Sequence, residues 1–257
     1  LLLALALGIE VECRIGNAVS PAHYARGWHI PASCGVFGAA AAAARLLGLT
    51  PELGAHALGI AASESAGLVE NLTTAAKNVG VGNAARNGIL AALLARAGFA
   101  AAPRAIEGPL GWARAMGDAP DLERMLGGLG SAWELLANTF KPYPSGVVLH
   151  AVADACLALR AAHGIDPAAV ESVSVFGDAL LLARGDRAVA NERDARVSIQ
   201  HTVAVCLLAG QAGLDEHTPA MALEPSVAAL RTRVRPVLDA ALPKGAARVE
   251  IALADGR

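Results

Sequence analysis

The sequence predicts a mainly α-helical fold, with a large all-helical domain over residues 1–139 and a smaller α+β domain over residues 140–257. Of its 257 residues, 54% are hydrophobic but only 4% are aromatic, and alanine accounts for most of the difference. Chains of this composition favour closely packed helices over sheets. The boundary lies at residues 140–145, Phe-Lys-Pro-Tyr-Pro-Ser, because each proline restricts the residue before it and stiffens the connector.

Residues typical of helix ends predict where the helices of the first domain begin and end. Thr50 is a helix N-cap, and Pro51 occupies the first helical position. Asn83 is the N-cap expected after a glycine-punctuated loop that carries Lys77. We predict helices over residues 1–15, 37–49, 50–67 and 83–98, with short helical pieces at 110–116 and 122–126.

The second domain mixes the periods of helices and strands. Residues 170–176 alternate as a strand does, Gly164 ends a helix that Ser145 caps, and a turn opens at Asp166. Strands and helices in this order indicate a small α+β domain. We predict helices over residues 145–163, 194–209 and 226–242, and strands over residues 170–176 and 247–254.

Charge, hydropathy and cysteine spacing exclude several classes of function. The net charge of −2 and the pI near 6.4 give no electrostatic reason to expect nucleic acid or an anionic membrane as a partner. No apolar run approaches the roughly 18 residues that a membrane span needs, so we predict a soluble, cytoplasmic protein. Cys13, Cys34, Cys156 and Cys206 form no C-x-x-C pair, which argues against zinc and iron–sulfur sites. We expect no cofactor.

The two ends predict that the chain is a fragment of a longer protein. It has no initiator Met, and its first eight residues look like the middle of a buried helix. A signal-peptide core is the alternative, but no basic segment precedes it and no small-residue cleavage site follows it. The chain stops just after a strand-like segment.

Lys77 is the first candidate for a functional side chain. Of the 21 lysines and arginines, only Lys77, Lys141 and Lys244 are lysines, so arginine stands at nearly every basic position. An ammonium is a compact point charge whose pKa moves readily on burial, unlike that of a guanidinium. Behind Lys77 runs a stretch of small residues against which another backbone can lie closely. The alternative is a solvated loop lysine.

Three histidines complete the candidate set. They are His29, in a loop rich in aromatic residues, His150, which stands four residues before Asp154, and His201. A core histidine that is merely hydrogen-bonded is the alternative for each. Together with Lys77 and Lys141 they supply positive charge and proton transfer without a set of metal ligands. Such groups suit a polycarboxylate, because positive charge stabilises the enediolate formed when a proton α to a carboxylate is removed.

Two other patterns have weaker interpretations. His29 and Cys34 are five residues apart and match a Cys–His nucleophile pair, although a buried structural thiol is the alternative beside an apolar helix. The glycines at 80 and 82 lack the preceding strand and the Lys-Ser/Thr ending of a nucleotide-binding loop, so we reject that interpretation.

Five motifs in order resemble the MmgE/PrpD family, which includes 2-methylcitrate dehydratase, cis-aconitate decarboxylase and iminodisuccinate epimerase. The resemblance covers nearly the whole chain. The motifs are Gly8-Ile-Glu-Val-Glu-Cys-Arg-Ile-Gly16, Gly27-Trp-His29 with Gly35-Val-Phe-Gly-Ala-Ala-Ala, Lys77 with Gly82-Asn-Ala-Ala-Arg-Asn-Gly88, Lys141-Pro-Tyr-Pro with His150-Ala-Val-Ala-Asp154, and Asp194-Ala-Arg-Val-Ser-Ile-Gln-His201.

This resemblance implies a helical domain with an α+β lid domain, a homodimer, and a metal-free site between the domains. It places catalytic roles on His29, Lys77 and His201, and substrate binding on Lys141 and His150 of the lid motif. The chain has glycines at 80 and 146, where the family or its decarboxylase branch has histidines. An upstream segment of the family that bears Asp and His has no counterpart in the chain.

The sequence therefore predicts a metal-independent lyase, a dehydratase acting on a small di- or tricarboxylate such as 2-methylcitrate. Alternatives within the family are an epimerase or isomerase, or a decarboxylase, acting on another polycarboxylate. The alternative from another class is a dimeric helical scaffold without catalysis, for which the glycines at 80 and 146 would be traces of a lost site.

Overall fold

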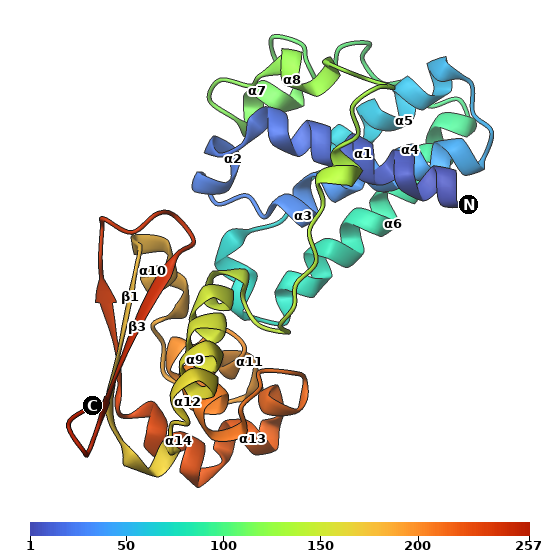
Figure 1. Cartoon of the computed structure of the whole chain (residues 1–257). Coiled ribbons are helices and arrows are strands. Elements are labelled where there is room, and N and C mark those ends of the chain that lie inside the picture. Colours follow the sequence, from blue (N-terminus) through green and yellow to red (C-terminus); the bar gives the residue numbers. More distant parts are fainter. The chain divides into compact units, whose positions relative to one another are not determined.

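The structure is a computed structural model that describes all 257 residues. Its contacts divide the chain into two compact units, Leu1–Thr139 and Phe140–Arg257, which we call unit 1 and unit 2. Unit 1 is helical, and unit 2 combines helices with a three-stranded sheet (Figure 1). The prediction of a mainly α fold with a smaller α+β part is confirmed. None of the helices is both long and apolar enough to cross a lipid bilayer.

Unit 1 is built around α4, which packs against α1, α5 and α6 (Figure 1). Its core is rich in alanine, and its two aromatic rings, Phe37 and Trp112, meet edge to face with centroids 4.9 Å apart. The elements are α1 Leu2–Val19, α2 Ala22–Ala25, α3 Ile30–Ser33, α4 Gly35–Leu46, α5 Pro51–Ser63, η1 Val69–Thr73, α6 Ala76–Arg96, α7 Trp112–Met116, α8 Leu122–Leu126 and η2 Glu134–Ala137.

Glycines let these helices approach one another closely. A Cβ atom added at Gly38 would lie 2.7 Å from the carbonyl oxygen of Gly8, where α4 crosses α1. A Cβ atom at Gly88 would lie 2.6 Å from the carbonyl oxygen of Val36, where α6 crosses α4. Neither contact has room for a methyl group, so the backbones themselves define the helix spacing.

Two expectations for unit 1 are wrong. Helix α6 begins at Ala76, not at Asn83, so Lys77 lies in its first turn and not in a loop. Gly80 lies inside α6 where the helix passes close to Ala32: a Cβ atom at Gly80 would lie only 3.2 Å from that of Ala32. The first residues of α1 are not a buried core, since Leu1 and Leu2 are 89% and 81% exposed.

Unit 2 consists of one sheet with helices packed on it. The strand order is β2-β1-β3, with β1 parallel to β2 and antiparallel to β3. Helices α9 and α12 pack together and supply much of the core (Figure 1). The elements are η3 Val147–Leu149, α9 His150–His163, η4 Pro167–Ala169, β1 Val170–Gly177, α10 Ala179–Gly185, α11 Glu192–Ala195, α12 Ile199–Ala209, η5 Asp215–His217, α13 Pro219–Leu223, α14 Pro225–Arg231, β2 Val234–Leu238 and β3 Ala247–Leu253.

Three boundaries in unit 2 differ from the prediction. The helix expected over residues 194–209 is two helices, because Ser198 starts a new one by accepting the N–H of His201. The helix expected over residues 226–242 ends at Arg231, and β2 follows it as a parallel partner of β1. Ser145 is not a helix cap, since a 3-10 turn precedes α9.

The glycine contacts make a prediction about stability. Gly88→Ala should destabilise unit 1 by about 1–3 kcal/mol, because the added methyl group meets backbone atoms that cannot rotate away. Gly82→Ala is the matched control in the same helix: it has no atom within 4 Å of the new Cβ and should stabilise by about 0.5–1 kcal/mol. Urea unfolding followed by tryptophan fluorescence measures both, since Trp28, Trp112 and Trp133 all lie in unit 1. Equal effects of the two substitutions would contradict the prediction.

Candidate functional site

His29 and Lys77 line the same pocket in unit 1. This pocket has a volume of about 310 Å³, and we call it the His29–Lys77 pocket. Its walls are α3, the segment between α5 and η1, and the first half of α6. The other polar residues that line it are Glu64, Asn71, Asn83 and Asn87.

His29 is held through its backbone. Its N–H donates to the carbonyl oxygen of Gly67 at 3.0 Å, and Trp28 pairs with Leu68 as an isolated β-bridge. Its own carbonyl oxygen accepts the N–H groups of Ala32 and Ser33 at 2.9 and 3.0 Å. The imidazole makes no hydrogen bond to another residue, although only 4% of His29 is exposed. The fixed backbone therefore leaves both ring nitrogens unused by the protein.

Burial, and then the nearby charge of Lys77, lower the pKa of His29 below its ordinary value of 6.5. Both causes disfavour the imidazolium form, because it would be poorly solvated and would face a second positive charge. His29 is therefore neutral at pH 7 and can accept a proton, as a general base must.

Lys77 supplies the positive charge of the pocket. It is half-buried, and its ammonium forms neither an ion pair nor a hydrogen bond with another residue. It stands in the first turn of the 21-residue helix α6, where the helix dipole also favours an anion. Glu64 is the only acid among the lining residues. Lys77 is thus available to pair with a carboxylate that enters the pocket.

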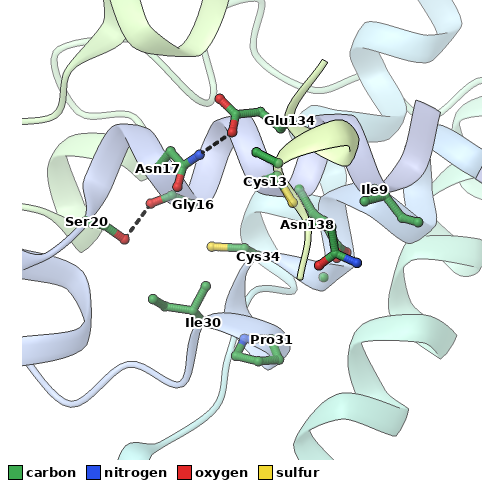
Figure 2. A pocket seen from close by; sticks show the side chains of 13 residues that line it. Ile9, Cys13, Gly16, Asn17, Ser20, Ile30, Pro31, Cys34, Glu134 and Asn138 are labelled. Carbon is green, nitrogen blue, oxygen red and sulfur yellow. Dashed lines mark hydrogen bonds between the residues drawn. The ribbon is translucent and has the colours of Figure 1, made fainter. Parts of the chain in front are cut away.

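A second pocket of unit 1 has the opposite charge. It has a volume of about 370 Å³ and lies between α1, α3 and η2 (Figure 2). Glu12 and Glu134 line it, and it has no lysine, arginine or histidine. Glu134 accepts a hydrogen bond from the amide of Asn17 at 3.0 Å. Burial raises the pKa of Glu12. This lining disfavours a polycarboxylate, so the His29–Lys77 pocket is the better candidate.

Cys34 does not join His29 in a nucleophile pair. Cys34 lines the acidic pocket with Cys13, whereas His29 lines the other one (Figure 2). Only 2% of Cys34 is exposed, and burial raises its pKa to about 12. The thiolate needed for nucleophilic attack is therefore absent at neutral pH. All four cysteines are free thiols.

In unit 2, the residues of the predicted lid motif form a local cluster. The Tyr143 hydroxyl donates to Asp154 Oδ1 at 2.6 Å, and this bond is the main reason why the pKa of Tyr143 is raised to about 12. The Tyr143 ring meets the His150 ring edge to face at 5.4 Å. His150 Nε2 is buried without a partner. Lys141 Nζ donates to the carbonyl oxygen of Ser145 at 3.4 Å. Asp154 thus pairs with Tyr143, and the tyrosine packs against His150.

His201 lies in the interior of unit 2 with both ring nitrogens engaged. Its Nε2 donates to the carbonyl oxygen of Glu216 at 2.8 Å, and its Nδ1 accepts from Arg231 Nη1 at 3.4 Å. Burial is the main cause that lowers its pKa to about 4. The ring also packs edge to face against His217, with centroids 5.5 Å apart. Proton transfer by His201 would require the release of one of these hydrogen bonds.

Sequence reasoning missed the amides of the His29–Lys77 pocket. Asn83 was expected to be a helix cap, and neither Asn71 nor Asn87 was singled out. The signal was helical spacing: Lys77, Gly80 and Asn87 fall on one face of α6 once the helix is known to start at Ala76. No three His, Cys, Asp or Glu side chains come together in an arrangement that could hold a metal ion.

Comparison with protein families gives two matches that together cover most of the chain. Residues 1–125 match the MmgE/PrpD N-terminal domain, and residues 143–257 match the MmgE/PrpD C-terminal domain. The chain belongs to the MmgE/PrpD family. Unit 1 contains the whole of the first match and unit 2 the whole of the second.

Curated MmgE/PrpD relatives of the chain are named cis-aconitate decarboxylase. The protein from Aspergillus terreus is 34% identical over 163 residues, which are 60% of this chain and 33% of that protein. The human protein is 33% identical over 164 residues, or 62% of this chain and 34% of that protein. The mouse protein is 28% identical over 249 residues, which are 91% of this chain and 50% of that protein. The chain therefore matches between a third and a half of the length of these relatives.

The buried His201 makes unit 2 sensitive to acid. The unfolded chain protonates this histidine near pH 6.5, but the folded chain only near pH 4. Stability present above pH 6.5 is therefore lost as the pH falls towards 4, with about 2 kcal/mol lost at pH 5. Hydrogen exchange of α12, corrected for its intrinsic rate, should show this loss. His201→Gln, which keeps a donor for Glu216, should remove the part that His201 contributes. The part due to the neighbouring His217, whose pKa burial also lowers, should remain.

The exposed His163 of α9 provides the control. His163→Gln should leave the pH dependence of α12 as it is in the unmodified protein. If His201→Gln also left it unchanged, His201 would not be the group that titrates.

Proposed function

We propose that this chain is part of a metal-independent lyase that acts on a small di- or tricarboxylate through proton transfer at the carbon α to a carboxylate. The observation that carries the proposal is the pairing of an unbonded neutral imidazole, His29, with an unpaired ammonium, Lys77, in one pocket of about 310 Å³. Membership of the MmgE/PrpD family and the names of the relatives support it.

The two side chains divide the chemistry between them. Neutral His29 takes the α proton, and the C–H electron pair passes to the adjacent carboxylate as an enediolate. The Lys77 ammonium pairs with that carboxylate and stabilises the second negative charge that develops on it. The three asparagines of the pocket offer neutral donors and acceptors for the remaining oxygens of the substrate. Lys141 and His150 are the proposed substrate-binding residues of unit 2.

One reaction, dehydration, follows directly from this proton abstraction, and a second, decarboxylation, shares only the ion pair between Lys77 and the substrate. In dehydration of a hydroxy acid such as 2-methylcitrate, the electron pair forms a C=C bond, and hydroxide leaves as water after taking up a proton. In decarboxylation, as the name cis-aconitate decarboxylase states for the relatives, a C–C bond breaks, CO₂ leaves and the remaining carbanion takes up a proton. This reaction removes no α proton, so it needs a proton donor and does not use His29 as a base. The glycines at 80 and 146 count against the usual form of both reactions, and similarity to the relatives favours the second.

We also propose that the protein acts as a homodimer, as the family resemblance implies. Sedimentation measurements on the intact protein test this. A monomer at micromolar concentration would contradict it.

The proposed function is tested by substitution of the two pocket residues. His29→Gln should lower kcat by about 10²–10⁴-fold, because the base is removed. Lys77→Ala should lower kcat/KM at least as strongly and also weaken polycarboxylate binding, whereas Lys244→Ala, the same substitution at an exposed lysine of unit 2, should change neither. The assay incubates the intact protein with 2-methylcitrate, citrate and cis-aconitate, with and without a chelator. It follows alkene absorbance and CO₂ release.

The outcomes separate the alternatives. Chelator-resistant alkene formation from the hydroxy acids identifies a dehydratase, and CO₂ release from cis-aconitate identifies a decarboxylase. A polycarboxylate-induced rise in melting temperature without either product indicates an epimerase or isomerase, since bound ligand stabilises the fold. The absence of both turnover and binding would favour the scaffold and overturn the proposal.

A further inference from the structure

His23 is a fully buried histidine next to the His29–Lys77 pocket but outside it. It belongs to α2, and its exposed fraction is 0%. Its Nδ1 lies 3.0 Å from the carbonyl oxygen of Met116, and its Nε2 lies 2.6 Å from Ser33 Oγ. Its ring stacks on Trp28 at 6.1 Å and packs at a tilt against Trp112 at 5.5 Å. His23 therefore joins α2 to both α3 and the end of α7.

The partners fix the direction of both hydrogen bonds. A carbonyl oxygen only accepts, so Nδ1–H donates to Met116. Burial lowers the pKa of His23, so at neutral pH its Nε2 carries a lone pair. The Ser33 hydroxyl then donates to Nε2 at 2.6 Å. The carbonyl oxygen of His29, at 3.2 Å, is the second acceptor within reach of the same proton.

The Ser33–His23 pair has the geometry of a nucleophile and its base, but it has no access to a substrate. Both residues are 0% exposed. Neither lines the His29–Lys77 pocket or the acidic pocket. A reacting carbonyl cannot reach the serine hydroxyl there, so the role of the pair is structural.

What the pair holds is α3, a helix of only four residues. Isolated helices of this length are not stable, so α3 depends on contacts with its surroundings. Ser33 is its last residue and His29 its N-cap. At one end the His23 bond fixes Ser33, and the Ser65 hydroxyl donates to the Ser33 carbonyl at 2.7 Å. At the other end, the His29 N–H binds Gly67.

We propose that His23 and Ser33 are positioning residues that hold α3, and through it fix the direction in which the His29 imidazole enters the pocket. The imidazole has no hydrogen bond of its own, so its position depends on the backbone at its Cα atom. Fixing the peptide groups on both sides of His29 fixes the Cα–Cβ bond. The effect on turnover rests on the proposed function, whereas the orientation of His29 can be measured without it.

The test compares His23→Phe, Ser33→Ala and the double variant in the intact protein. His23→Phe keeps a ring between the tryptophans but removes both hydrogen bonds, and Ser33→Ala removes the hydroxyl alone. The matched control is His56→Phe, because His56 Nδ1 accepts the N–H of Ala101 at 3.1 Å elsewhere in unit 1. The measurements are kcat, KM, melting temperature and the NMR signals of the ¹³C-labelled His29 ring across pH.

Each single variant should lower kcat by about 10- to 100-fold, because a displacement of about 1 Å is enough for such a loss. KM should change less than about twofold, since Lys77 is untouched. The double variant should be within about twofold of the worse single variant, because both remove the same hydrogen bond. The His29 ring signals should shift in all three variants. His56→Phe should leave both kcat and the His29 signals unchanged.

Unchanged His29 signals in Ser33→Ala would overturn the inference. The inference would also be overturned if Ser33→Ala and His56→Phe lowered kcat to the same extent for the same fall in melting temperature. If the unmodified protein turns over none of the acids, the proposed function fails and the His29 signals alone decide the inference. If His23→Phe does not fold, Ser33→Ala still provides the test, because it removes one oxygen atom and adds no volume.

Discussion

The close approach of α4 to α1 and α6 is the constraint on which unit 1 depends. Helix backbones meet at Gly8, Gly38 and Gly88, where a single methyl group would overlap carbonyl oxygens. Because the contacts involve backbone atoms, the axis of α6 cannot slide or turn without a clash. Buried alanines pack the C-terminal part of α6, and the same helix carries Lys77 in its first turn. The backbone of Lys77 is therefore positioned by the packing of α6.

His29 is positioned by a different means. It precedes a helix of one turn that cannot stabilise itself, so a network of hydrogen bonds to Gly67, Ser65 and His23 takes the place of helix length. Both arrangements have the same result. The backbone at each residue is fixed by several contacts, while the imidazole of His29 and the ammonium of Lys77 form no hydrogen bond within the protein. Both groups line the same pocket, so a ligand that enters it can form hydrogen bonds and an ion pair with them.

Composition and local signals predicted what depends on nearby residues. Thr50 does accept the N–H of Leu53 as an N-cap, and Gly164 does end α9 in the left-handed region. Features that depend on contacts between distant residues could not be predicted from the sequence. Gly80 indicated a loop by propensity, yet it lies inside α6 where that helix packs near Ala32, and β2 pairs with β1, which is distant in the sequence. His29 and Lys77 were found by their chemistry, yet only the packing of α3 on α6 brings them into one pocket.

The charge of Lys77 acts on His29 twice within the proposed reaction. In the free protein burial is the main cause that lowers the pKa of the imidazole, and the charge of Lys77 lowers it further, so the base is neutral before the substrate arrives. A carboxylate that pairs with Lys77 offsets this charge and adds a negative one beside the ring. Opposite charges raise the pKa of an imidazole, so the bound substrate makes His29 a stronger base at the moment when it must take a proton. The same carboxylate is the group on which charge builds as that proton leaves. In the proposed reaction, one ion pair thus couples substrate binding, the strength of the base and stabilisation of the enediolate.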